Sequence, residues 1–170
     1  MSNITPLTTV PAMDTDASSR VIELLEERLA ASIDLALTLK HAHWNVVGMN
    51  FIAVHEMLDP QVDKVREQSD ELAERVATLG GEPSGTPKSV VDARSWDDYA
   101  VGRASAADHL SALDDVYTGL ISDHRRVAAE LADLDPVSED IFIGHLRDLE
   151  LFQWFVRAHL KDASGEVAHN

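Results

Sequence analysis

The segment that decides the fold runs from His43 to Glu74 and reads HWNVVGMNFIAVHEMLDPQVDKVREQSDELAE. From Asn50 onward its apolar residues recur mostly three or four positions apart, which is the period of an α-helix with one buried face. The apolar positions are Phe51, Val54, Leu58, Val62, Val65, Leu72, Val76 and Leu79. The sequence therefore predicts one helix that begins after a cap at Asn50 and ends at Gly80-Gly81.

Pro60 disturbs this pattern, because a proline inside a helix removes one backbone hydrogen bond and clashes with the preceding turn. The apolar period is the same on both sides of it. We therefore expect one bent helix rather than two helices, and a kink at this position can re-aim the neighbouring Asp59.

Helical periods also precede and follow this segment. The first extends from about residue 16, where Asp16 is a suitable N-cap, to about residue 46. Two more long helices are expected at residues 101–134 and 136–160, the last of them capped by Asp135 and opened by a proline.

The connection between the second and third long helices begins as a loop, because residues 80–94 are rich in Gly, Pro and Ser. We expect a short helix to start at Ser95. Four long helices with almost no strand signal indicate an all-α four-helix bundle. This bundle should span residues 16–161 as one domain, between a flexible tail at 1–15 and a short tail at 162–170.

The composition restricts the possible partners. The chain of 170 residues has 30 acidic and 14 basic residues, so its formal charge is -16, which repels nucleic acid and acidic membranes and attracts cations. The absence of cysteine excludes disulfides, thiolate catalysis and iron–sulfur clusters. No apolar run reaches the ~18 residues of a membrane span, and the N-terminus does not resemble a signal peptide. We expect a soluble, cytoplasmic protein.

Five potential metal ligands lie in the deciding segment, namely His43, His55, Asp59, Asp70 and Glu74. His55 and Asp59 share one helix face, and so do Asp70 and Glu74, because each pair is four positions apart. The two pairs cannot meet in one helix, since the eleven positions from Asp59 to Asp70 correspond to roughly 16 Å. A second, antiparallel copy across a two-fold axis brings one subunit's first pair beside the other's second pair.

Imidazole and carboxylate ligands without sulfur suit Fe(II), Mn(II) or Zn(II). A structural alternative is that His43 is a buried core residue and that the other four are surface residues paired with Lys64 or Arg75. Polar groups so close to an apolar stripe are costly unless they are paired or ligated. The spacing alone therefore places a metal site only slightly ahead of this alternative.

Two known helical metal motifs are incomplete. The run HEMLD begins like the zinc hydrolase motif H-E-x-x-H but ends in Asp. Glu166 and His169 form the only Glu-x-x-His motif, and it lies in the C-terminal tail. A dinuclear centre inside one subunit is therefore not expected, and a metal-assisted hydrolase remains the weaker alternative.

The runs HWNVVGMNF, HEMLD and DELAER closely resemble the Dps family, the ferritin-like mini-ferritins of bacteria, and especially its actinobacterial members. The runs WDDY and FQWF extend the match. The resemblance implies a hollow shell of twelve subunits that binds Fe(II), oxidises it preferentially with hydrogen peroxide and stores a ferric mineral. It also implies a ferroxidase site at the two-fold interface, with His43, His55 and Asp59 from one subunit and Asp70 and Glu74 from its partner.

The resemblance extends to residues outside this ligand set. Trp44 is expected near the iron, where it can take a stray oxidising equivalent, although a core indole is an equal alternative. In the acidic cluster at the start of the last helix we expect Asp140 to line an iron entry pore. A helix dipole alone accounts for the others, which are Asp133, Asp135 and Glu139. No ligand role is expected for five further histidines, which are His109, His124, His145, His159 and His169.

The terminal segments argue against direct DNA binding. Residues 1–19 contain no Lys or Arg, and the C-terminal tail has only Lys161 near its start. Members of the family that compact DNA often carry a basic tail, so little DNA affinity is expected at physiological salt. A DNA-protecting, nucleoid-associated protein is therefore the second hypothesis after a ferroxidase.

Overall fold

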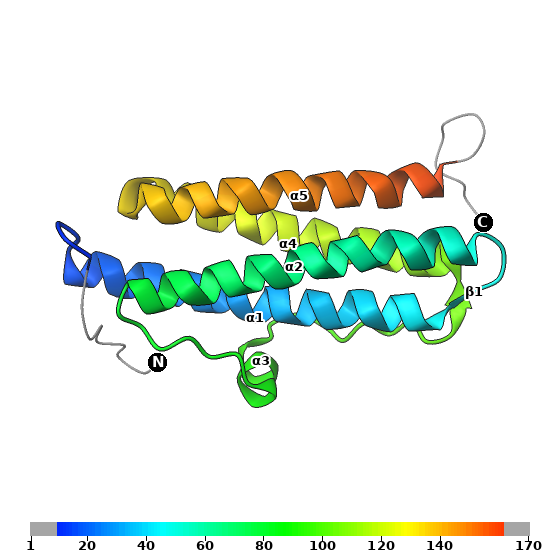
Figure 1. Ribbon diagram of the computed structural model, residues 1–170, viewed down its shortest axis with the longest axis horizontal. Coiled ribbons are helices and arrows are strands. Elements are labelled where there is room, and N and C mark those ends of the chain that lie inside the picture. Colours follow the sequence, from blue (N-terminus) through cyan, green and yellow to red (C-terminus); the bar gives the residue numbers. More distant parts are fainter. Residues whose placement is uncertain (1–9, 162–170) are drawn as a thin grey trace.

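Four long helices pack side by side in the computed structural model, which describes residues 10–161 (Figure 1). Their bounds are α1 Thr15–Asn45, α2 Phe51–Thr78, α4 Ala106–Leu134 and α5 Pro136–Leu160. Helix α1 packs mainly on α2, and α4 mainly on α5. The long connection between α2 and α4 returns along the bundle, so these two helices run in the same direction (Figure 1). The predicted four-helix bundle is confirmed.

The long connection carries a short helix, α3, at Pro87–Ala93 and ends in a two-residue strand, β2, at Ala104–Ser105. Strand β2 pairs in parallel with β1, Val46–Val47, which follows α1 directly. This pairing ties the α1–α2 turn to the start of α4. Strands of two residues are too short to leave a periodic signal in the sequence.

Helix α3 lies earlier than the sequence predicted, and the expectation of a helix beginning at Ser95 is wrong. Thr86 caps α3 by accepting a hydrogen bond from the Ser89 N–H at 3.3 Å, and Pro87 occupies the first turn. The Trp96 indole Nε1–H instead donates to Asp34 at 2.8 Å and fastens this part of the connection to α1. A tertiary hydrogen bond therefore replaces the predicted helical turn.

Two helix starts also differ from the predicted positions. Helix α4 begins after Ser105 rather than at residue 101, because Ser105 and Asp108 form a reciprocal capping box there. At α1 the N-cap is Asp14 rather than Asp16, and its side chain accepts hydrogen bonds from two backbone N–H groups of the first turn. Residues 1–9 of the tail predicted at 1–15, and the whole tail predicted at 162–170, lie outside the described residues.

Helix α2 is a single helix that continues through Pro60, as predicted. Asn50 occupies its N-cap position but has a left-handed backbone, with φ of 64°, and makes no side-chain cap hydrogen bond. Gly48 in the same turn has φ of 86°. Glycine and asparagine are the residues that tolerate this conformation best, which explains a sharp turn directly before α2.

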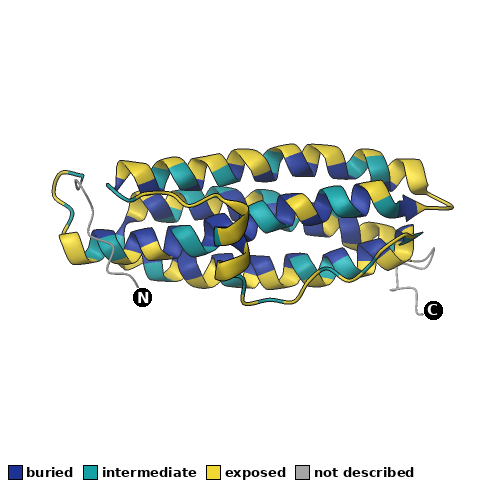
Figure 2. Ribbon diagram, turned by 90° about the horizontal axis from the view of Figure 1, so that it is seen from below, coloured by how far each residue is buried: buried dark blue, intermediate teal, exposed yellow. Residues whose placement is uncertain are grey.

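Buried residues recur along the long helices and alternate with exposed ones, as the colouring of Figure 2 shows. The predicted apolar stripe of α2 is buried from Val54 to Leu79, whereas Phe51 at its start is 38% exposed. Tyr117 donates a hydrogen bond to Gln61 at 2.7 Å inside the core. Burial of each Leu or Val side chain contributes roughly 1.5–3 kcal/mol, and this fixes which face of α2 points outward. Among residues 10–161 no helix is long and apolar enough to cross a membrane.

Candidate metal centre

His43 and His55 stack face to face where the end of α1 meets the first turns of α2. Their ring centroids are 3.6 Å apart. Nδ1 of His43 donates to the backbone carbonyl of His55 at 2.9 Å, and Nδ1 of His55 donates to the carbonyl of His43 at 3.0 Å. Only a protonated nitrogen donates to a carbonyl, so in the neutral form of each ring Nε2 carries the free lone pair. Metal-binding histidines are oriented in the same way by a hydrogen bond at their other nitrogen.

Asp59 lies one turn beyond His55 on α2. Its Oδ1 is 3.3 Å from Nδ1 of His43 and 2.9 Å from Nζ of Lys40. The hydrogen bond from Lys40 lowers the pKa of Asp59 below its ordinary value. The three ligands predicted for one subunit are therefore neighbours, but Lys40 holds the Asp59 carboxylate on the Nδ1 side of the His43 ring.

Asp70 and Glu74 lie further along α2, and both are exposed. In the described part of the chain neither carboxylate has an ion-pair or hydrogen-bond partner. Lys64 pairs with Glu67 at 2.7 Å, and Arg75 pairs with the start of α5. The pairing with Lys64 or Arg75 that the structural alternative expected is therefore wrong, whereas its expectation of a buried His43 is confirmed.

The two groups of ligands do not meet within one chain. Among residues 10–161 no three His, Asp or Glu side chains surround a common position for a metal ion. Because α2 is continuous, Asp59 and Asp70 are separated by roughly 16 Å of helix rise. One subunit thus presents a histidine-rich group and a separate carboxylate pair.

Exposed apolar side chains are frequent in this region of the chain. They are Leu37, Trp44, Val47, Met49, Phe51 and Ile52. Trp44 is 71% exposed, with Nζ of Lys40 5.6 Å from its ring centroid, so the expectation of a core indole is wrong for the single chain. Exposed apolar surface of this kind is typical of a protein–protein contact.

Two histidines without a predicted role form a buried polar layer between α4 and α5. The ring centroids of His124 and His145 are 6.3 Å apart. Nδ1 of His124 donates to the carbonyl of Leu120, and Nε2 of His145 donates to Glu71. Burial lowers the pKa of both, that of His124 to about 3, so His124 is neutral. Their position on separate helices leaves no spacing signal in the sequence.

Two residues of the acidic cluster at the start of α5, Asp135 and Asp140, differ in burial and in their partners. Asp135 is buried and accepts hydrogen bonds from Arg75 and Ser138. Burial alone raises its pKa, but the bonds from Ser138 and Arg75 outweigh burial and the pKa is lowered. Asp140 is exposed and borders a polar hollow of about 270 Å³ between α2 and α5. Asp140 is therefore the more accessible of these two carboxylates.

Comparisons with known proteins agree with this architecture. The family model of the ferritin-like domain matches residues 22–165. The DNA protection during starvation protein of Mycolicibacterium smegmatis is 54% identical over 161 residues, which cover 95% of this chain and 88% of that protein. The chain belongs to the Dps family of ferritin-like proteins.

Solved Dps structures have the same fold. DpsA14 from Streptomyces coelicolor superposes with a TM-score of 0.95 and 56% identity, over 99% of this chain and 100% of that one. The tetragonal form of Mycobacterium smegmatis Dps superposes with a TM-score of 0.93 and 54% identity, over 95% of this chain and 99% of that one. The resemblance to actinobacterial Dps proteins is thus confirmed.

Proposed function

We propose that this protein is a ferroxidase and iron-storage protein whose iron site forms between two subunits. His43, His55 and Asp59 of one subunit and Asp70 and Glu74 of its partner are the proposed ligands. One observation carries the proposal. The reciprocal Nδ1 hydrogen bonds leave two Nε2 atoms free, while the unpaired carboxylates lie too far along the same helix to reach them.

A two-fold axis supplies the missing contact. When α2 of one subunit lies antiparallel to α2 of the partner, the histidine-rich group of each faces the carboxylate pair of the other. The exposed apolar side chains around Trp44 and Phe51 become buried in the same contact. We propose that such pairs assemble further into a shell of twelve subunits.

Iron is the substrate and hydrogen peroxide is the proposed oxidant. Two Fe(II) ions each lose one electron, and one peroxide accepts both. Its O–O bond breaks, and two protons complete two water molecules. Carboxylate ligands favour the product because their attraction to Fe(III) exceeds that to Fe(II). Since one peroxide takes both electrons, no hydroxyl radical is released.

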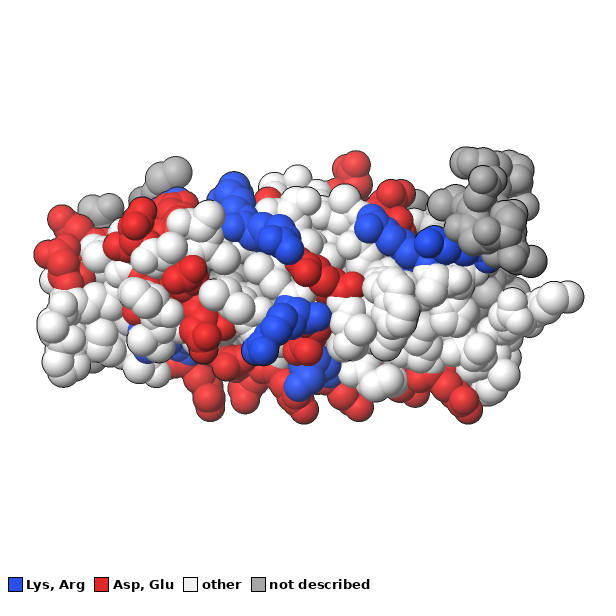
Figure 3. Space-filling view, turned by 90° about the horizontal axis from the view of Figure 1, so that it is seen from above, with Lys and Arg blue, Asp and Glu red and all other residues white. Residues whose placement is uncertain are grey.

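This chemistry also supports a protective role without direct DNA binding. On the face shown in Figure 3, Lys and Arg side chains form small groups among Asp and Glu rather than a continuous basic surface. The formal charge of -16 opposes the approach of a polyanion. We therefore propose that the protein protects DNA by consuming Fe(II) and peroxide. Asp140, exposed at the start of α5, is the proposed pore residue.

The test is addition of Fe(II) and peroxide to the purified, metal-free protein without oxygen, with serum albumin as the control. We expect two Fe(II) oxidised per peroxide and no spin-trapped hydroxyl radical. Soluble ferric mineral should co-elute with a particle of about twelve times the 18.7 kDa chain. Ferric precipitate outside the protein, together with trapped radical, contradicts the proposal.

A further inference from the structure

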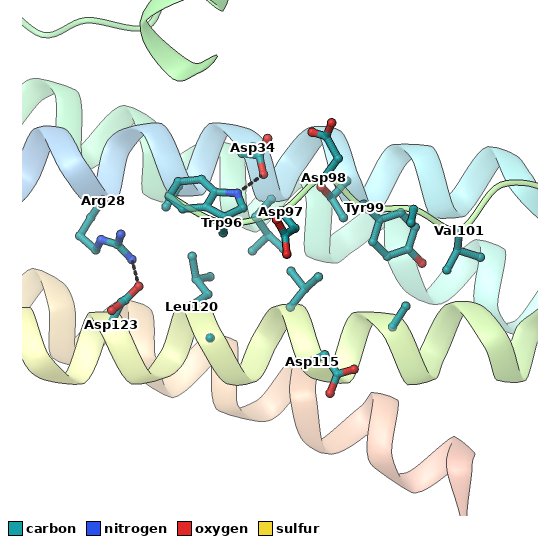
Figure 4. A pocket seen from close by; sticks show the side chains of 17 residues that line it. Arg28, Asp34, Trp96, Asp97, Asp98, Tyr99, Val101, Asp115, Leu120 and Asp123 are labelled. Atoms are coloured by element: carbon teal, nitrogen blue, oxygen red, sulfur yellow. Dashed lines mark hydrogen bonds and ion pairs between the residues drawn. The ribbon is translucent and has the colours of Figure 1, made fainter. Parts of the chain in front are cut away.

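A second cavity, which contains none of the proposed iron ligands, lies between α1 and α4 beneath residues 96–101 (Figure 4). Its volume is about 380 Å³, within the range of small-molecule sites. Leu35 from α1 and Leu120 from α4 contribute to its apolar walls, and the rings of Trp96 and Tyr99 line it from the connection. The cavity therefore has room and apolar surface for a small organic molecule.

Arg28 forms one end of this cavity and carries an unsatisfied hydrogen-bond donor. Its side chain is 1% exposed, and its terminal nitrogens bind Asp123 at 3.3 Å and Glu27 at 3.0 Å. In Figure 4 the guanidinium extends from α1 toward Asp123. The Nε–H is buried without a partner. The Nε atom is closed off from the cavity in this conformation, so a ligand oxygen reaches it only when the Arg28 side chain turns toward the cavity; the hydrogen bond then offsets the about 1–3 kcal/mol cost of a buried, unpaired donor.

The remaining charge of the lining is strongly negative. Five carboxylates line the cavity, those of Asp34, Asp97, Asp98, Asp115 and Asp123. With Arg28 they leave a formal charge of -4, which Arg94 and Arg126, paired with three of these carboxylates from beside the cavity, reduce to -2. Arg94 pairs with Asp34 and Asp98, whereas Asp97 and Asp115 have no ion-pair partner within residues 10–161. This charge favours a cation and disfavours an anion, even beside Arg28.

We propose that the cavity binds a small amphipathic amine, with an ammonium group at one end, an apolar body and a hydrogen-bond acceptor at the other end. The ammonium group lies by Asp97, which Figure 4 places between Trp96 and Tyr99, where an aromatic face also attracts a cation. The body packs on the apolar walls, and the acceptor receives the Arg28 Nε–H. Each part of the ligand thus matches one feature of the lining.

The test uses tyramine, whose phenol oxygen, ring and ammonium group represent these three parts. Calorimetry on the assembled, full-length protein should show saturable binding of one tyramine per chain. Tyramine binding should also shift the ¹⁹F signal of 5-fluorotryptophan at position 96. This signal is assigned by its loss in the variant Trp96→Phe. We expect 4-ethylphenol and 3-(4-hydroxyphenyl)propanoate, which lack the ammonium group, to bind at least about tenfold more weakly. Phenethylamine, which lacks the oxygen, should bind a few-fold more weakly.

Two variants locate the binding. A side chain at Gly119 meets no atom within 4 Å at its Cβ, so Gly119→Leu should fold normally, fill the cavity and abolish binding. Ala129→Leu, an exposed position on the same helix outside the cavity, is its control. Asp97→Asn should weaken tyramine about tenfold, whereas Asp63→Asn on α2 should not. Absence of saturable binding, equal binding of 4-ethylphenol, or unchanged binding by Gly119→Leu overturns the proposal.

Discussion

The two groups of candidate ligands on and around α2 differ in how far one chain prepares them. His43 and His55 hold each other in one orientation through their backbone carbonyls, and Lys40 holds Asp59. The carboxylates of the other group, further along the helix, are exposed and unpaired. The fold of one chain thus organises the histidine group, and we propose that a partner subunit gives the carboxylate pair its role.

The largest loss of iron oxidation is expected when the histidine group, which a single chain holds in place, is removed. His43→Ala combined with His55→Ala deletes both free imidazole nitrogens, so stopped-flow oxidation of Fe(II) by peroxide should slow at least about 100-fold. His159→Ala, at an exposed histidine bonded only to its own helix, is the control and should oxidise iron normally. Unchanged kinetics in the double variant contradict the assignment.

Removing the exposed carboxylate pair should slow iron oxidation about as much, while the histidine group stays intact. Asp70→Asn with Glu74→Gln keeps the side-chain shapes but removes two anionic ligands, so oxidation should again slow about 100-fold. The imidazole ¹⁵N spectrum of the metal-free protein should stay unchanged. Asp63→Asn with Glu67→Gln is the matched control on the same helix. A loss of only a few-fold shows that Asp70 and Glu74 are not ligands.

A buried histidine outside the candidate metal centre makes the stability of the fold depend on pH. The folded pKa of His124 is about 3 and its ordinary value is 6.5, so below pH 6.5 only the unfolded chain binds this proton. The contribution of His124 to stability is complete above pH 6.5. It falls by about 1.4 kcal/mol per pH unit toward pH 3.

Denaturant unfolding between pH 7 and pH 5 measures this effect. The wild-type slope of unfolding free energy against pH should exceed that of His124→Gln by an amount that rises to about one proton, or about 1.4 kcal/mol per pH unit, as the pH approaches 5, whereas His159→Gln should keep the wild-type slope. Equal slopes for wild type and His124→Gln show that His124 accepts a proton in the folded protein.

The smallest effect is expected at Lys40, which competes with metal for Asp59. A partly exposed ion pair contributes about 0.2–1 kcal/mol, so Lys40→Gln should tighten binding of Co(II), a non-oxidising probe, by a few-fold. Lys40→Arg keeps the charge and is the calorimetric control. Weaker binding in Lys40→Gln implies instead that Lys40 positions Asp59 for the metal.

Helical periodicity predicted the bundle well because burial of one face leaves a repeat in each long helix, and α2 continues through Pro60 as expected. The connection was less predictable, since Trp96 is fastened by Asp34 from another helix and local patterns do not record such contacts. The candidate ligands were predicted from spacing together with the family resemblance, and the structure shows that three of them, His43, His55 and Asp59, are neighbours. The Lys40–Asp59 bond joins two helices and left no signal in the sequence.

The most direct test of the shared site is to mix the two defective subunits. Co-assembled chains, one with His43→Ala and His55→Ala and the other with Asp70→Asn and Glu74→Gln, form one intact site at each mixed two-fold interface. Random pairing of equal amounts makes half of the interfaces mixed, so about a quarter of the wild-type oxidation rate should return. A rate no higher than the mean of the two parents contradicts a site shared between subunits.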